Sequence, residues 1–161
     1  MNVEREPFHR RSDGSFTVWL TEDERDVLRG LTDEFGDLLR NESQSSDPAV
    51  ARLFPAAYPD DALRNLDYDR AVHDDLLAGR LAAVAEVERT VGATGLSEDE
   101  LLSWLAVIND LRLVMGARMG LTEDLTEEDL DLGEAPAPYR LYAYLTYLVG
   151  SIVEALGDPT G

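Results

Sequence analysis

Two helix starts are marked in the sequence by the same four-residue pattern. Thr21-Glu22-Asp23-Glu24 and Ser97-Glu98-Asp99-Glu100 each place a hydroxyl residue three positions before a glutamate. In such a capping box the hydroxyl accepts a hydrogen bond from the backbone amide of the glutamate, and the carboxylate accepts one from the amide of the hydroxyl residue. Apolar residues recur at intervals of three and four after each box, as they do along one face of a helix. The chain must therefore be mainly helical.

The same spacing, read between glycines and prolines, predicts the other helices. We expect helices over 21–40, 48–54 (with Asp47 as N-cap), 60–91 (with a break near 67–69), 98–119 and 139–156, and short helical turns over 122–132. Gly92 and Gly95 are expected to end the long helix over 60–91. The helix over 98–119 has apolar residues on nearly every side, which predicts a central, largely buried helix.

The first twenty residues differ from the rest of the chain. Ser12-Asp13-Gly14 separates two short runs rich in aromatic and β-branched residues, which is a signal for a hairpin. Phe16 and Val18 alternate with Thr17 and Trp19, the period of a half-buried strand. The sequence therefore predicts a mainly α fold: an N-terminal β-hairpin within 1–20, then a bundle of about five helices over 21–157, together a single domain over 1–161.

The composition excludes several chemistries. The 161 residues include no cysteine and no lysine, which rules out a thiolate nucleophile, a disulfide and a Schiff base. There are 33 acidic residues against 14 arginines, a formal charge of −19, which opposes binding to nucleic acids and to anionic membranes. The acidic surface serves either solubility or the attraction of a basic partner.

No motif for a metal site or for hydrolysis is apparent. Glu6 and His9 have the Glu-x-x-His spacing of di-iron bundles, but Pro7 favours an extended segment there. The acidic run 123–131 lacks the order of a calcium loop. The N-terminus has no apolar stretch of a signal peptide, and the longest uncharged stretch, 141–153, is too short to span a bilayer. We therefore expect a cytoplasmic protein with no cofactor, no metal and no catalytic residue.

One segment places polar residues in an apolar helix. Its members are Asn109, Asp110, Arg112, Gly116 and Arg118. Buried polar groups are costly unless they are paired. The residues therefore form an internal network that holds helices in register, line a recognition groove for a peptide or small anion, or lie at a helix edge without a role.

The last helix is rich in tyrosine. Tyr139, Tyr142, Tyr144 and Tyr147 cannot all share one face at 100° per residue. Exposed tyrosines suit a protein interface because they bury a large area at low entropic cost. These residues are a candidate interface, and ordinary packing at the boundary of the core is the alternative.

Several segments together resemble a known family. They are 20–29 (LTEDERDVLR), 47–58 (DPAVARLFPAAY), 104–122 (WLAVINDLRLVMGARMGLT) and 142–149 (YAYLTYLV). The chain resembles an uncharacterised actinobacterial family, a domain of unknown function, whose genes often lie beside that of the ClpS protease adaptor. The resemblance implies a small cytosolic helical protein without an established activity, and a link to Clp-dependent proteolysis. The family motif falls on Asn109, Asp110, Arg112, Gly116 and Arg118.

The leading hypothesis is a non-enzymatic protein-interaction or regulatory protein. It binds a protein partner, with the Clp system as one candidate, or associates with itself as a homodimer. The alternative is a small-ligand sensor or enzyme that uses an arginine–carboxylate site around Asn109–Arg118.

Overall fold

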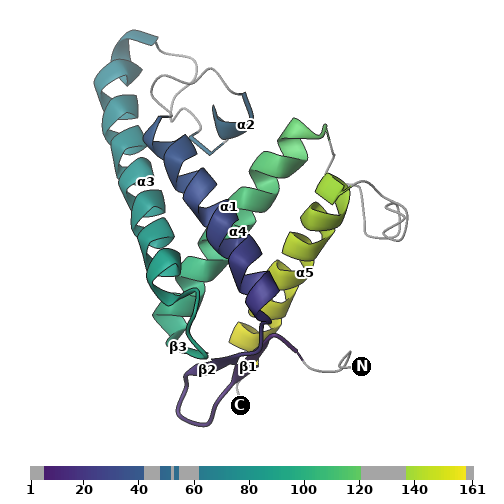
Figure 1. Ribbon diagram of the computed structural model, residues 1–161. Helices are drawn as coiled ribbons and strands as arrows, with labels where there is room; N and C mark the ends of the chain where they lie inside the picture. The colour runs from purple at the N-terminus through teal and green to yellow at the C-terminus, as the bar shows by residue number, and fades with distance from the viewer. Residues whose placement is uncertain (1–5, 42–47, 52, 55–61, 121–136, 159–161) are drawn as a thin grey trace.

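The computed structural model describes residues 6–41, 48–51, 53–54, 62–120 and 137–158, with 62–69 as backbone only. These residues form three strands and five helices (Figure 1). The elements are β1 (Phe8–Arg10), β2 (Phe16–Val18), α1 (Glu22–Arg40), α2 (Pro48–Ala51), α3 (Ala62–Thr90), β3 (Gly95–Leu96), α4 (Glu98–Arg118) and α5 (Ala137–Gly157). The mainly α fold with an N-terminal hairpin is confirmed. The predicted turns over 122–132 and the predicted N-cap Asp47 lie outside the described residues.

Both capping boxes form as the sequence predicts. Thr21 Oγ1 accepts from the Glu24 amide at 3.1 Å, and Glu24 Oε1 accepts from the Thr21 amide at 2.9 Å. At the start of α4, Ser97 and Glu100 repeat the exchange at 3.1 and 2.8 Å. Each box satisfies two backbone donors that helix geometry would otherwise leave free.

The hairpin gains a third strand that the sequence did not indicate. β1 pairs with β2 around the Asp13-Gly14 turn, where Gly14 has a φ of 89°. β2 also pairs with β3 in the order β1-β2-β3, all antiparallel. Gly95 lies in β3, so our expectation that it ends the long helix was wrong. A strand of two residues is too short to show an alternating pattern.

The expected break in the long helix is also absent. α3 runs without interruption from Ala62 to Thr90. Asp67-Tyr68-Asp69 suggested a break because aspartate is a poor helix former. Helix propensity is a weak preference, however, and it is readily overridden in a helix of this length.

α4 lies in the middle of the helices, with α3 and α5 packed along its two sides and α1 crossing in front of it (Figure 1). Trp104 of α4 is fully buried, and its ring meets that of Phe8 edge-on at 5.9 Å between centroids. α4 is not largely buried on all sides, which corrects the expectation. Leu102 and Leu113 are 44% and 49% exposed. Its neighbours leave the side opposite Trp104 uncovered.

Candidate interaction surfaces

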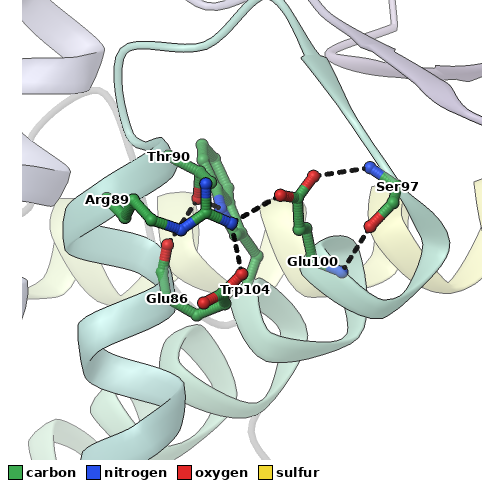
Figure 2. Close-up of polar contacts among 6 residues, drawn as sticks. All are labelled: Glu86, Arg89, Thr90, Ser97, Glu100 and Trp104. Atoms are coloured by element: carbon green, nitrogen blue, oxygen red, sulfur yellow. Dashed lines mark hydrogen bonds and ion pairs between the residues drawn. The ribbon is translucent and has the colours of Figure 1, made fainter.

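A polar network joins the end of α3 to the start of α4 (Figure 2). Arg89 of α3 donates to Glu100 Oε2 at 2.6 Å and also to Glu86, so it ties α3 to the capping box of α4. Beside it, the Trp104 indole donates to Thr90 Oγ1, which in turn donates to the Glu86 carbonyl, both at 2.7 Å. Hydrogen bonds from the Ser97 amide and from Arg89 lower the pKa of Glu100. All these partners belong to the chain itself, so the network fixes the α3–α4 junction.

The polar residues of the family motif point in different directions from α4. Asp110 faces α3 and pairs with Arg80 at 3.1 Å. Asn109 accepts from Arg112 Nη2 at 2.8 Å, within one turn of the same helix. Gly116 lies under the Tyr142 ring of α5, where an added Cβ would sit 3.1 Å from a ring carbon. Arg118 is exposed in the last turn. The five residues therefore do not converge on one cavity.

The Arg80–Asp110 pair borders a shallow hollow of about 400 Å³. Asp110 is 8% exposed, and this burial raises the pKa of its carboxyl although Arg80 opposes the shift. The Arg80 guanidinium also lies 5.3 Å from the centre of the Phe54 ring. Arg112 and Arg118 do not line this hollow.

The four tyrosines of α5 have different surroundings. Tyr142 covers Gly116, and Tyr144 donates to Glu24 Oε2 of α1 at 2.5 Å. Tyr139 is half-buried near the start of α5, whereas Tyr147 is 48% exposed. The tyrosines therefore do not form one stripe, and among them Tyr147 has the most accessible ring.

Tyr147 lines a cleft of about 440 Å³ between α5 and the β2–α1 junction. The cleft is bordered by Trp19, which is 41% exposed, and by the Glu24 carboxylate. Leu20, Thr21, Val18, Pro7, Thr94 and the buried Arg25 complete its walls. We call this space the Trp19–Tyr147 cleft.

A second surface lies on the opposite side of the helices. It consists of Leu102, Ala106, Asn109 and Leu113 on α4 and Thr146, Gly150 and Val153 on α5. The α4 residues lie on the side of that helix opposite Trp104. The α5 residues lie on the same side of α5 as Tyr142, and this side faces away from the contact of Tyr144 with α1. We call it the acid-free face after its own α4 and α5 residues, because residues 101–118 contain one acid, the buried Asp110, and residues 137–153 contain none. Asp75 of α3 borders it beside Ala106 and Asn109.

These two surfaces account for most of the exposed apolar side chains. Among the described residues, six large apolar side chains are strongly exposed: Trp19, Val27, Leu102, Leu113, Tyr147 and Val153. Two line the cleft and three lie on the acid-free face, which leaves Val27 by itself on α1. Exposed apolar groups that gather in one place mark interaction sites, whereas single ones are ordinary.

Within the described ranges, no group of three acidic or histidine side chains could hold a metal ion. No described helix is long and apolar enough to cross a membrane.

Part of these surfaces could not be predicted from the hydrophobic pattern. Leu102 and Leu113 lie on the helix that was expected to be largely buried, Val153 lies on the predicted helix over 139–156, and Trp19 was placed only in the alternation of a half-buried strand. One signal was available, namely the near absence of acids over 101–118 and 137–153 in a chain with 33 of them. That contrast separates an uncharged surface from the rest of an acidic protein.

The fold and these surfaces define a mainly α-helical protein with a small antiparallel sheet against one end of its helices. The chain belongs to the family described as Domain of unknown function (DUF2017), whose model matches residues 5–156. No curated protein and no solved structure matches the chain.

Proposed function

We propose that this chain is a non-enzymatic protein-interaction protein whose copies associate through the acid-free face. The observation that carries the proposal is the exposure of Leu102, Leu113 and Val153 on stretches of α4 and α5 that carry no exposed acid. Two copies that each carry a charge of −19 repel one another over most of their surfaces. They meet at lowest electrostatic cost where both are uncharged.

The spacing and size of the residues on the acid-free face also suit packing against α4 and α5 of a second copy. Leu102, Ala106, Asn109 and Leu113 follow one another at spacings of four, three and four, which is the repeat of helix–helix packing. Ala106 on α4 and Gly150 on α5 are small, so a partner backbone can approach closely there. In a two-fold arrangement the same patch serves both copies.

Sedimentation equilibrium over a range of protein concentrations tests the proposal. We expect a dimer, and we expect Leu113→Glu and Val153→Glu each to shift it to monomer, because each places a charge in the contact. Val27→Glu is the matched control, since Val27 is 43% exposed on α1, away from this face. A monomer at every concentration, or equal disruption by Val27→Glu, would contradict the proposal.

We also propose that the protein acts in the cytosol and is linked to Clp-dependent proteolysis, as the family resemblance implies. Capture of purified ClpS or Clp subunits by the immobilised chain tests this link. We expect capture that added NaCl weakens, because an acidic chain attracts a basic patch on its partner. The absence of capture at low salt would remove the Clp system as a partner without affecting self-association.

The alternative function is a small-ligand sensor or enzyme that uses an arginine–carboxylate site around Asn109–Arg118. One observation favours it: Arg112 Nε is buried and has no acceptor in the described part of the chain. Arg112→Leu distinguishes the two ideas. A structural role predicts lower stability in urea, whereas a ligand site predicts unchanged stability and the loss of any thermal shift caused by small anions.

A further inference from the structure

We infer that the hollow between α3 and α4 receives Leu113 of a second copy, in a dimer whose two-fold axis passes beside Asn109. This inference rests on the proposed function, because it requires self-association through the acid-free face, and it adds how the two copies fit together. Three observations carry it: a hollow with small apolar walls, an exposed leucine one turn beyond Asn109, and an accessible amide group without an acceptor.

The hollow has the form of a site for an apolar side chain. Gly79 and Ala83 of α3 and Ala106 of α4 are its small walls, and Leu76 completes the apolar lining. A Cβ built on Gly79 has no neighbour within 4 Å, so the space above this glycine is open. In helix packing, an apolar side chain of one helix inserts between four residues of its partner. The hollow offers such a set of four residues from two helices of one copy.

The charged groups of the hollow leave this apolar part accessible. Asp110 is 8% exposed and pairs with Arg80 at 3.1 Å, so its charge is compensated within the chain. Asp75 is exposed at the rim. It precedes Ala83 by eight residues along α3, which is about 12 Å at the rise of a helix. The part of the hollow at Ala83 therefore lies away from the charge of Asp75 and suits a leucine.

Asn109 supplies a donor that the described part of the chain does not use. Its Oδ1 accepts from Arg112 Nη2 at 2.8 Å, which fixes the orientation of the amide. Its Nδ2 donates to no described residue and is not one of the buried atoms without a partner, so it reaches the surface. A polar group that becomes enclosed in an interface costs free energy unless it is paired.

A second Asn109 is a suitable partner for this amide. An amide oxygen has two lone pairs, so Oδ1 can accept from Arg112 and from the Nδ2 of the other copy at once. When the two amides face each other across the axis, each copy gains an acceptor for its free donor. A polar residue in such a contact fixes the register of two helices.

The position of Leu113 relative to Asn109 fits an antiparallel pair of α4 helices. A two-fold axis perpendicular to α4 at Asn109 places residues after Asn109 opposite residues before it. Leu113 lies about 6 Å after Asn109 along the helix, and Ala106 about 4.5 Å before it. Leu113, which is 49% exposed, therefore meets the partner at Ala106 and the mouth of the hollow. A parallel pair would place Leu113 on Leu113 and leave the hollow open.

Disulfide cross-linking shows which positions face each other. The chain has no cysteine, so the thiol of a single-cysteine variant is unambiguous. Two cysteines join only when their Cβ atoms lie within about 3.5–4.5 Å. We expect Asn109→Cys to cross-link with itself, and a mixture of Ala106→Cys and Leu113→Cys to give the mixed dimer. Val27→Cys, on the exposed side of α1, is the control that should not cross-link.

A side chain built into the hollow tests its occupant. Gly79→Leu fills the space with a residue that favours a helix, so we expect the fold to persist and the dimer dissociation constant to rise about tenfold or more. Gly30→Leu is the matched control, because Gly30 is also a helical glycine without a neighbour within 4 Å, and it lies on α1. Sedimentation equilibrium measures association, and urea denaturation checks that both variants fold.

The outcomes separate this inference from the proposed function. A wild-type chain that stays monomeric would contradict both. A dimer that Gly79→Leu and Gly30→Leu affect equally would retain the acid-free face but remove the hollow as the site of Leu113. Cross-linking of Ala106→Cys with Asn109→Cys, in place of Asn109→Cys with itself, would move the axis away from Asn109. Self-cross-linking of Leu113→Cys would show a parallel pair. Either result would overturn the inference.

Discussion

A single buried guanidinium connects three parts of the molecule. Arg25 lies near the start of α1, and its guanidinium donates hydrogen bonds to the carbonyls of Val91 and Ala93, just beyond the end of α3. A second nitrogen lies 3.4 Å from the Val18 carbonyl of β2. These acceptors belong to segments that would otherwise leave buried carbonyls without donors. Arg25 therefore acts as a structural cross-link between helix, loop and strand.

We expect Arg25→Met to lower the free energy of unfolding by about 2–4 kcal/mol, because it leaves several buried carbonyls unpaired. Urea denaturation measures the change. Arg29→Met is the control, since Arg29 is exposed and pairs only with Asp26 one turn earlier, at 2.7 Å. A change below about 0.5 kcal/mol is expected there. Equal losses in both variants would show that Arg25 acts only through its charge.

Thr90 is the acceptor for the most deeply buried indole. Thr90→Val keeps the shape of the side chain but leaves the Trp104 N–H without its acceptor. The expected cost is about 1–3 kcal/mol of unfolding free energy. The double variant Thr90→Val/Trp104→Phe should cost less than the sum of the two single changes, since it removes donor and acceptor together. Strict additivity in urea denaturation would contradict a direct bond.

At the scale of elements, the glycines in the helices have different roles. Gly36 in α1 lies against α3, where an added Cβ would sit 3.3 Å from the Val84 side chain. Gly116 of α4 similarly admits the Tyr142 ring of α5. Gly30, in the middle of α1, has no such neighbour within 4 Å. Gly36 and Gly116 therefore allow neighbouring helices to pack closely, whereas Gly30 only lowers the stability of α1.

Gly30→Ala should raise the free energy of unfolding by about 0.5–1 kcal/mol, because alanine loses less backbone entropy in a helix. Gly116→Ala should give a smaller gain or a loss, because the Tyr142 ring must move. Thermal unfolding of both variants checks the contrast. A larger gain for Gly116→Ala than for Gly30→Ala would show that the α4–α5 contact tolerates a side chain there.

The elements could be predicted to different degrees. The capping boxes of Thr21 and Ser97 and the Asp13-Gly14 turn are local signals, and each forms as expected. β3 could not be predicted, because Gly95 and Leu96 become a strand only through pairing with β2. The exposed side of α4 depends on where α1, α3 and α5 lie. The Trp19–Tyr147 cleft joins residues 128 positions apart, which no local pattern could reveal.

At the scale of the whole molecule, charge separates self-association from the capture of a basic partner. Self-association through the acid-free face brings two chains of −19 together, so screening should favour it. Capture of a partner through a basic patch is attractive, so the same screening should weaken it. The two processes therefore respond to salt in opposite directions.

We expect the dimer dissociation constant to fall when NaCl is raised from about 0.02 to 0.3 M, where the Debye length drops severalfold. Over the same range a captured basic partner should lose affinity. Sedimentation equilibrium and the capture assay measure the two affinities on the same protein. If both affinities fell with salt, attraction between opposite charges would also drive self-association, which would contradict an uncharged contact.

The first strand and the last helix are joined directly: Arg10 of β1 donates to the Leu156 carbonyl at 3.0 Å, and β1 packs against α5 (Figure 1). A ribosome must therefore release the chain through the end of α5 before β1 can acquire this partner. During synthesis Phe8 and Phe16 emerge before the helices that cover them. The hairpin is consequently exposed in the newly made protein until α5 has been completed.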